Sequence, residues 1–303
     1  MTPEVREGIW RLADPKISIT SVAAMLVGLA PAIRADRYSW TWLAVTALAL
    51  FCMEVAKNAW GDVIDYDSGA DLAVRPQDRT AFSGGKRVMV DELLTRAQTW
   101  AVAAIFGGAG VLLGAVIVFL REPYAALIGV LGVVLGWSYH GPPLKLVYRG
   151  LGELDVVICY GPLIVLSTYL IQTHELNWAV FWLSLPLGLF IAAFLWVNEF
   201  PDYEADRGAG KRNLVARLGR RNASRVLPWI YALAFGLIMA LPWLAAVPLA
   251  AWLGFLALPF AIFACWHTWK QPEDFYRSRP VQPAALLAFN AYAIGVAAGV
   301  IWG

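Results

Sequence analysis

The sequence predicts an all-α polytopic membrane protein with nine transmembrane helices. The composition, the pattern of the apolar runs and the distribution of basic residues support this fold class. Hydrophobic residues make up 59% of the 303 residues, charged residues make up 15%, and the mean hydropathy is +0.59. Soluble domains carry about 45–50% apolar and about 25% charged residues. The composition therefore excludes an ordinary soluble enzyme, a disordered chain and a nucleic-acid binder with a large basic face.

Nine segments are apolar enough to cross a bilayer, which takes about 20 mostly apolar residues in a helix. Continuous runs such as 125–136 and 180–197 lack the alternation of a β-barrel strand. The predicted spans are residues 17–33, 40–60, 96–120, 124–139, 153–172, 178–200, 226–243, 246–268 and 283–302. Residues 1–16 are predicted to form an interfacial segment rather than a cleaved signal peptide. We expect residues 1–303 to form a single membrane domain.

The basic residues test this arrangement of spans. With nine spans, one side of the membrane receives the N-terminus and the loops after spans 2, 4, 6 and 8. Only three of the 24 Lys and Arg residues fall on the other side, namely Arg34, Arg37 and Arg121. Basic residues are retained on the cytoplasmic side of a membrane. We therefore expect a protein of the cytoplasmic (inner) membrane with its N-terminus inside and its C-terminus outside.

Acidic residues gather where span 2 ends on the predicted cytoplasmic side. Asn58, Asp62 and Asp65 are spaced i, i+4 and i+7, so they share one face of a helix. Glu54 extends this face into the membrane, whereas Asp67 lies off it and is an expected bystander. A charged residue at the centre of a span costs about 2.5–3.5 kcal/mol, so such acids need a functional reason.

A second acidic cluster closes span 6. Asn198, Asp202 and Asp206 repeat every four residues, again on one helical face. Each cluster is followed by a Gly-Lys-Arg element, at residues 83–87 and 208–212. The clusters lie four spans apart on the same predicted side, which suggests an internal repeat.

Carboxylates stacked on one face repel each other unless a cation neutralises them. Mg²⁺ is typically bound by one or two carboxylates, several waters and substrate phosphates. Lys and Arg side chains complete a phosphate site as charge donors. The acids, glycines and bases together predict a diphosphate–Mg²⁺ site facing the cytoplasm. The alternative is a pair of solvated helix ends with ordinary surface charges.

A third polar element lies after span 4, level with the acids. Two prolines stop the helix that ends near Tyr139, and glycines precede span 5. Lys145 and Arg149 are expected to contact phosphate. The alternative is that their positive charges only keep the loop on the cytoplasmic side of the membrane. Glu153 is expected just inside span 5. His140 is expected to be a loop residue rather than a base.

Together, these three elements resemble the UbiA superfamily of intramembrane prenyltransferases. Members of that superfamily have nine transmembrane helices, with Asp-rich motifs after helices 2 and 6. The resemblance covers almost the whole chain, and residues 198–219 carry its most specific motif. Residues 148–153 and 78–85 look like the branch that contains the 1,4-dihydroxy-2-naphthoate polyprenyltransferases of menaquinone synthesis.

The first acidic motif fits the common family pattern Asn-Asp-x-x-Asp-x-x-x-Asp in two registers. Read from Asn58, the first Asp falls at Asp62 and the last position is occupied by Tyr66. The other register puts Gly61 where Asn is usual. That register aligns four residues with the branch pattern, namely Asp62, Asp65, Gly69 and Asp71. Both registers remain open at the level of the sequence.

The resemblance implies a nine-helix bundle around a central cavity, with a lateral opening that admits the lipid tail. It implies transfer of a polyprenyl group from a polyprenyl diphosphate to an aromatic acceptor. The implied cofactor is Mg²⁺, bound as two ions. The implied metal ligands are Asp62, Asp65, Asp71, Asp202 and Asp206. The implied catalytic residues are Asp62, Asp65, Asp202, Asp206 and Lys145. The implied substrate-binding residues are Asn58, Arg75, Arg79, Lys86, Tyr139, Arg149, Glu153, Asn198 and Lys211.

The resemblance favours 1,4-dihydroxy-2-naphthoate as the acceptor. A hydroxybenzoate, homogentisate, a glyceryl-phosphate lipid and a porphyrin-type ring remain alternatives. A transporter with an acidic ion pathway is an alternative from a different class of protein. Transporters typically place their charges near the bilayer midplane in broken helices. The acids here lie at helix ends on one side, which favours the enzyme.

Overall fold

The structure, a computed structural model, describes residues 1–303 apart from the side chains of residues 15–17. Every regular element that it describes is helical, as the sequence predicts. The longer elements are α1 (Pro3–Ala13), α2 (Pro15–Arg34), α3 (Trp40–Ser68), α5 (Arg96–Leu120), α6 (Ala125–His140), α7 (Gly152–Ile158), α8 (Ile164–Thr173), α9 (Trp178–Gly208), α11 (Arg220–Leu244), α12 (Leu258–Lys270) and α14 (Val281–Trp302). The short elements are α4 (Ala70–Ala73), η1 (Pro76–Asp78), η2 (Leu146–Arg149), η3 (Cys159–Leu163), α10 (Leu214–Leu218), η4 (Leu249–Ala257) and α13 (Phe275–Ser278).

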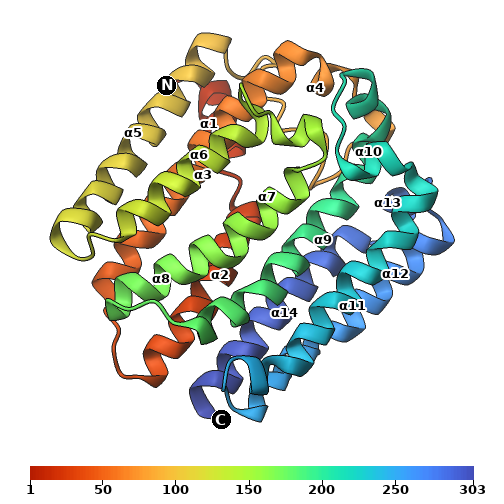
Figure 1. Cartoon of the computed structure of the whole chain (residues 1–303). Helices are drawn as coiled ribbons and strands as arrows, with labels where there is room; N and C mark the ends of the chain where they lie inside the picture. The colour runs from red at the N-terminus through yellow and green to blue at the C-terminus, as the bar shows by residue number, and fades with distance from the viewer.

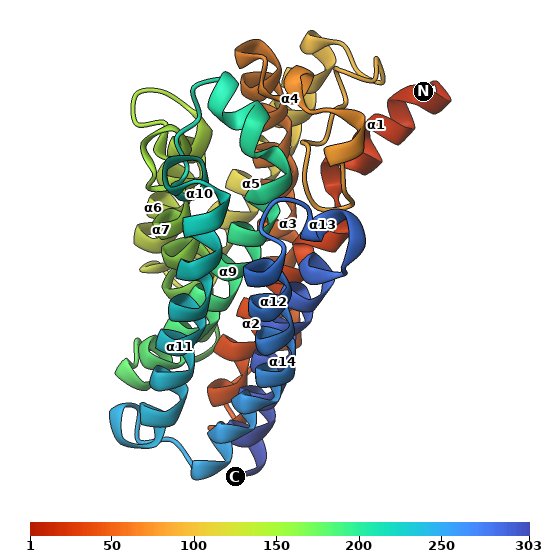
Figure 2. The same cartoon turned by 90° about the vertical axis from the view of Figure 1, so that its right-hand side faces the viewer.

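The described helices confirm the membrane-spanning character of the chain. Eight helical stretches are long and apolar enough to cross a bilayer, and α6 is a ninth, shorter apolar helix. Three of the eight stretches join two or more helical segments, namely Pro3–Arg34, Gly152–Thr173 and Leu249–Lys270. α1, α4 and α10 lie toward one end of the bundle and the C-terminus lies at the other (Figures 1 and 2).

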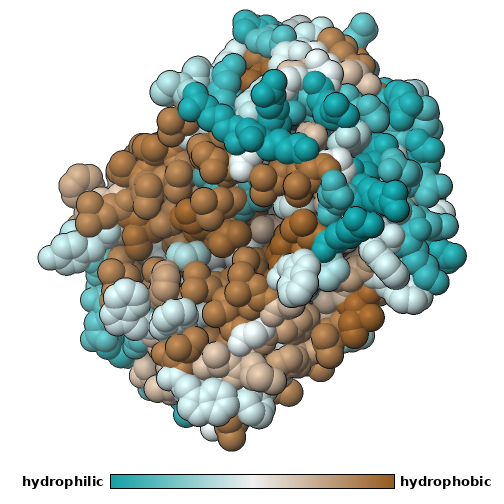
Figure 3. Space-filling model, turned by 45° about the vertical axis from the view of Figure 1, so that its right-hand side comes forward, coloured by the Kyte–Doolittle hydropathy of each residue, from teal (hydrophilic) through white to brown (hydrophobic). Residues whose placement is uncertain are grey.

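Apolar side chains cover much of the outer surface of the bundle. Phe119 and Trp302 are 82% and 81% exposed, and many leucines and tryptophans are exposed beside them. Figure 3 shows brown, hydrophobic residues over most of one face and teal, hydrophilic residues gathered toward the end that holds α10. An exposed apolar area of this extent marks a surface that contacts lipid rather than water.

The described residues form three packed apolar clusters, and the two largest contribute to the walls of one cavity. The larger core joins α2, α8, α9, α11, α12 and α14, with α9 in contact with α2, α7, α11 and α14. The smaller core joins α1, α3, α5 and residues 88–94. α3 packs closely on α5, and its contacts with α2, α6 and α8 are sparser. Space therefore remains between the α3–α5 pair and the larger core.

Glycines permit a close helix approach beside the kink in the larger core. Gly161 lies in the π-helical turn η3, and Gly188 lies opposite it on α9. A Cβ atom on Gly188 would lie 2.5 Å from the carbonyl oxygen of Val157. The kink beside Pro162 turns the chain from α7 into α8 while keeping this contact with α9. Such breaks are tolerated within a bundle because neighbouring helices satisfy the freed backbone groups.

The three basic residues predicted for the opposite side lie together at the far end. Arg121 donates to the carbonyl of Ile171 at 2.8 Å, and Arg37 also binds the end of α8, at the carbonyl of Thr173. Arg34 donates to the carbonyl of Val300 at 2.7 Å, near the C-terminus. Basic side chains near the ends of helices satisfy free carbonyl groups there. Their position agrees with the charge asymmetry predicted from the sequence.

Candidate active site

The first acidic motif lies on the last three turns of α3. The predicted span ends at residue 60, but the helix continues to Ser68 and ends at Gly69, whose φ is +81°. A glycine in this left-handed conformation is a common helix terminator. The continuous helix holds Asn58, Asp62 and Asp65 on one buried face. Asp67 is exposed and pairs with Arg96 at 2.8 Å, as expected of a bystander.

Lys211 connects the first motif to the second. α9 continues to Gly208, and it carries Asn198, Asp202 and Asp206 into the interior. The ammonium of Lys211 lies 2.7 Å from Asp65 Oδ2 and 3.7 Å from Asp206 Oδ1. Two motifs separated by more than 130 residues therefore share one buried cation.

The loop after α4 closes over both motifs. The backbone N–H of Gly84 donates to Asp202 Oδ2 at 3.0 Å. Gly85 has a φ of +74°, and a Cβ atom there would lie 2.3 Å from Asp71 Oδ1. The side chain of Arg87 donates to the carbonyl of Asp71 at 3.0 Å. The glycines are needed because the backbone passes against two carboxylates at this point.

Asn213 holds the start of α10 against the second motif. Its amide nitrogen donates to Asp206 Oδ2 at 2.8 Å, and its Oδ1 accepts the N–H of Ala216 at 2.7 Å. The second bond is an N-cap, which satisfies a free N–H at the helix start. One side chain thus orients Asp206 and begins the helix that follows.

The carboxylate oxygens around this centre fit a divalent cation. In the part of the chain that the structure describes, buried oxygens without a hydrogen-bond partner occur on Asp62 (both oxygens), Asp65, Asp71 and Asp202. Carboxylate oxygen is the donor that Mg²⁺ prefers. Among the described side chains, no three His, Cys, Asp or Glu residues already form a metal-binding group. Mg²⁺ usually keeps several waters and takes ligands from substrate phosphates, so it does not require such a cage.

The charge balance at the centre shifts the pKa of two groups outside the spans. Burial, and then the neighbouring charge of Asp65, raise the pKa of Asp71 to about 8. Burial alone would lower the pKa of Lys211, but Asp65 and Asp206 outweigh it and raise that pKa above its usual range. Lys211 therefore stays positively charged, while Asp71 retains a proton at neutral pH in the metal-free protein.

The two motifs open into a cavity of about 1430 Å³. The lining changes from polar at the motifs to apolar along α5 and α6, where Gly110, Gly114 and Gly132 are exposed to the cavity. Eleven of the predicted site residues line this cavity, namely Asn58, Asp62, Asp65, Asp71, Arg79, Lys86, Tyr139, Asn198, Asp202, Asp206 and Lys211. Tyr66, the last position of one register, is not among the described lining residues.

Four predicted site residues are not among the described residues that line the cavity. Lys145 is exposed and lies 5.4 Å from the centre of the Tyr148 ring. Arg149 is also exposed and donates to the carbonyl of Pro143. Arg75 donates to Asp78 at 2.7 Å. Glu153 is buried and accepts the N–H of Leu214.

His140 differs from its predicted placement in a loop. It is the last residue of α6, and its Nε2 lies 3.4 Å from Asp65 Oδ2. Its ring also covers Gly61, where a Cβ atom would lie 3.0 Å from His140 Cε1. The helix runs one residue further than the prolines suggested, and this extra residue brings the imidazole to the first motif.

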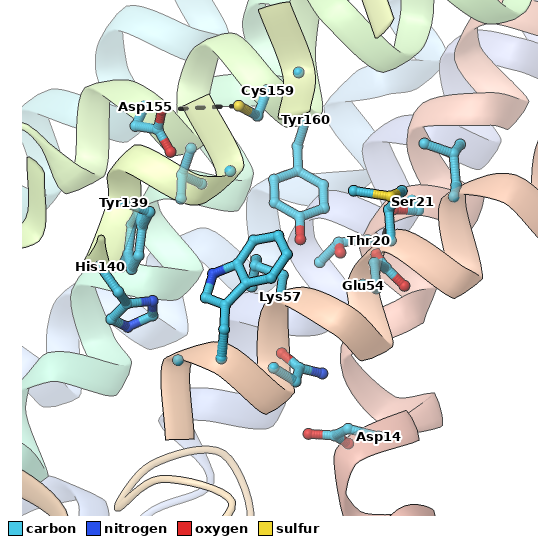
Figure 4. Close-up of a pocket in the computed structure, with 18 of the residues that line it drawn as sticks. Asp14, Thr20, Ser21, Glu54, Lys57, Tyr139, His140, Asp155, Cys159 and Tyr160 are labelled. Carbon is cyan, nitrogen blue, oxygen red and sulfur yellow. Dashed lines mark hydrogen bonds between the residues drawn. The ribbon is translucent and has the colours of Figure 1, made fainter. Parts of the chain in front are cut away.

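The site-residue predictions did not include a set of ionisable residues deeper in the cavity. Glu54, Lys57 and Asp155 line it together with Cys159 and Tyr160, as Figure 4 shows. The available signal was the presence of charged residues inside apolar spans, which is costly unless they face a partner or a cavity. Glu54 extends the helical face of the first motif, whereas Asp155 lies on a different span.

Comparisons with known proteins find relatives along most of the chain. The model of the UbiA prenyltransferase family matches residues 20–294. The 1,4-dihydroxy-2-naphthoate octaprenyltransferase of Bacillus subtilis is 27% identical over 79% of this chain and 77% of its own. The 2-carboxy-1,4-naphthoquinone phytyltransferase of Synechocystis is 30% identical over 70% of this chain and 64% of its own.

A solved structure extends the likeness to the fold. The UbiA homolog from Archaeoglobus fulgidus, bound to GPP and Mg²⁺, superposes with a TM-score of 0.63. The match covers 96% of this chain and 99% of that one, at 16% sequence identity. At this identity the likeness concerns the arrangement of the helices.

Proposed function

The chain belongs to the UbiA prenyltransferase family, and we propose that it transfers a polyprenyl group from a polyprenyl diphosphate to 1,4-dihydroxy-2-naphthoate in menaquinone synthesis. One observation carries the proposal. Two carboxylate motifs meet around Lys211 at the polar end of a largely apolar cavity. Such a cavity suits a substrate with a diphosphate head and an apolar tail. The naphthoate acceptor is supported by the relatives in Bacillus and Synechocystis.

The carboxylates are proposed to hold Mg²⁺, as two ions. The proposed ligands are Asp62, Asp65, Asp71, Asp202 and Asp206. Bound Mg²⁺ would supply positive charge that stabilises the diphosphate leaving group. The solved relative that contains GPP and Mg²⁺ supports the use of this metal.

The chain's own residues then account for the transfer. Lys211, Arg79 and Lys86 stabilise the charge that develops on the diphosphate as its bond to the allylic carbon breaks. The electron-rich ring of the acceptor attacks that carbon and forms a new C–C bond. A naphthoate ring then loses its carboxyl group as carbon dioxide. The apolar walls exclude water, which would otherwise convert the allylic cation into an alcohol.

The proposed location is the cytoplasmic membrane, with the site facing the cytoplasm, the N-terminus inside and the C-terminus outside. The strong excess of Lys and Arg at the end that carries the site supports this orientation. Residues 1–303 are proposed to act as one prenyltransferase domain, whose α1 lies along the membrane surface.

An acceptor panel tests the proposed function. Purified protein with Mg²⁺ and a polyprenyl diphosphate is offered 1,4-dihydroxy-2-naphthoate, a hydroxybenzoate, homogentisate and a glyceryl-phosphate lipid, and products are identified by mass spectrometry. We expect a decarboxylated, prenylated naphthoquinol and released diphosphate, both abolished by EDTA. A prenylated product with only one of the other acceptors would contradict the proposed acceptor.

A further inference from the structure

The cavity contains a second polar region, below the carboxylate motifs, that diphosphate binding leaves unexplained. Its charged members are Glu54 and Lys57 on α3 and Asp155 on α7, all within membrane-spanning helices. An ionisable side chain at this depth is costly and commonly serves a ligand or a transport pathway. The region faces the same cavity as the two motifs, so a molecule bound there would lie beside the diphosphate.

Lys57 is the basic group at the centre of this region, and the neighbouring cation Lys86 is paired with Asp14. Its ammonium lies 5.8 Å from the centre of the Tyr139 ring, and it interacts electrostatically with Glu54 and Asp155. Among the side chains that the structure describes, none forms a hydrogen bond or an ion pair with it. A lysine that served only to neutralise neighbouring acids would be expected to contact one of them directly. The ammonium is therefore available to an anion in the cavity.

Hydrogen-bond acceptors and donors surround this cation. Glu54 accepts a hydrogen bond from Ser21 Oγ at 2.5 Å, and its second oxygen is buried without a partner in the described structure. Among the described side chains, the hydrogen-bond donor to the Asp155 carboxylate is the weakly donating thiol of Cys159, whose sulfur lies 3.8 Å away. The hydroxyl of Tyr160 points toward Thr20 and Glu54 in Figure 4. The two carboxylates can thus accept hydrogen bonds from a ligand.

The position of Lys57 along α3 suits the acceptor rather than the diphosphate. Lys57 precedes Asp62 by five residues, which corresponds to about 7.5 Å along a helix axis. That separation is comparable to the length of a fused bicyclic aromatic ring. An acceptor whose carboxylate contacts Lys57 would keep its substituted ring, which carries the reacting carbon, within reach of the diphosphate end of the cavity, while Ile164 and Phe194 supply apolar walls.

We propose that Lys57 binds the carboxylate of an aromatic hydroxy acid, and that Glu54 and Asp155 accept hydrogen bonds from its hydroxyl groups. The proposal rests on the proposed function and specifies the chemistry of the acceptor. One cation and two carboxylates complement a ring that carries one carboxylate and phenolic hydroxyls. An acceptor without the carboxylate would leave the ammonium unpaired, which costs binding energy.

A matched pair of ligands tests this acceptor subsite without requiring turnover. 1-Hydroxy-2-naphthoate and 1-naphthol differ only in the carboxylate, and their binding to the purified full-length protein is measured by titration calorimetry. We expect the wild type to bind the acid about tenfold more tightly or better, the effect of one charge-assisted hydrogen bond. Equal affinities for the two ligands in the wild type would overturn the proposal.

Variants of Lys57 then assign the preference to this residue. Lys57→Met should weaken binding of the acid about tenfold and change that of 1-naphthol less than about twofold, whereas Lys57→Arg should retain the preference. Lys86→Met removes a cation from the same cavity and should raise the KM for the diphosphate instead. If the Lys57→Met variant still prefers 1-hydroxy-2-naphthoate over 1-naphthol, the assignment of this preference to Lys57 is wrong. Should that variant fail to fold, the wild-type comparison and Lys57→Arg still decide the matter.

Activity separates this proposal from the proposed function. A protein that binds the acid selectively but releases no diphosphate with any aromatic acceptor would retain the subsite and refute the reaction. A protein that prenylates dihydroxynaphthoate but binds both test ligands equally would retain the reaction and refute the subsite.

Discussion

Asp71 is the residue whose protonation should control metal binding. The pKa of its carboxyl is raised to about 8 by burial and by Asp65, from an ordinary value near 3.9. Below pH 8 the metal-free protein therefore holds a proton there, and Mg²⁺ must displace it. We expect Mg²⁺ affinity to rise by up to about tenfold per pH unit between pH 6 and 8 and to level off above. The measurement is the half-saturating Mg²⁺ concentration for diphosphate release at each pH. In the Asp71→Asn variant, the half-saturating Mg²⁺ concentration should vary less with pH than in the wild type. A wild-type half-saturating concentration that does not change with pH would contradict the account.

Individual residues differ in how well the sequence predicts their place. The helical spacing of Asn58, Asp62 and Asp65 suffices to predict their shared face, because α3 is continuous there. Lys145 and Arg149 lie in a loop whose path depends on tertiary contacts, and the structure leaves both exposed. The local signal at Lys57, a charge inside an apolar span, is weak, because lysines near the end of a span often only extend their charge to the interface.

Among the elements, the loop between α4 and α5 that contains Gly84 and Gly85 is expected to position Asp71. Gly85→Ala would place a Cβ atom 2.3 Å from Asp71 Oδ1 and should lower kcat about 10–100-fold, as disturbed orientation of a metal ligand does. Gly69→Ala is the matched control. It also has a positive φ, but its Cβ atom would meet nothing within 4 Å. Both variants should lose about 1–2 kcal/mol of stability in thermal unfolding, from the left-handed backbone alone. Equal kcat values for the two variants would show that the contact with Asp71 is unimportant.

The spans are the elements that the sequence predicts best. An apolar stretch in a membrane must satisfy its backbone hydrogen bonds internally, so hydropathy largely determines where helices occur. Hydropathy does not predict where a helix is interrupted within a span. The π-helical turn at Cys159–Leu163 packs against α9, and hydropathy does not signal it. The extension of α3 and α9 beyond their apolar parts is supported by burial of the acidic faces in the cavity, which hydropathy does not report.

At the scale of the whole molecule, the fold encloses the charged motifs inside the helix bundle, away from lipid. It also brings two motifs that are distant in the sequence together. The larger core carries the second motif on α9, and the smaller core carries the first on α3. Lys211 and the loop at Gly84 connect them across the cavity. The sequence predicts that the two motifs lie on the same side of the membrane. Their contact depends on the packing of both cores and could not be read from spacing.

The central claim is that the two motifs form one metal–diphosphate site. The most direct measurement is the kcat for diphosphate release by Asp62→Ala, Asp202→Ala and the double variant, with Asp67→Asn as an exposed control. Removing one electrostatic stabiliser typically lowers kcat about 10²–10³-fold. Residues that act as a unit are not additive, so the double variant should lose little more than either single variant. Asp67→Asn should remain close to the wild type. Multiplicative losses in the double variant, or full activity in either single variant, would contradict the account.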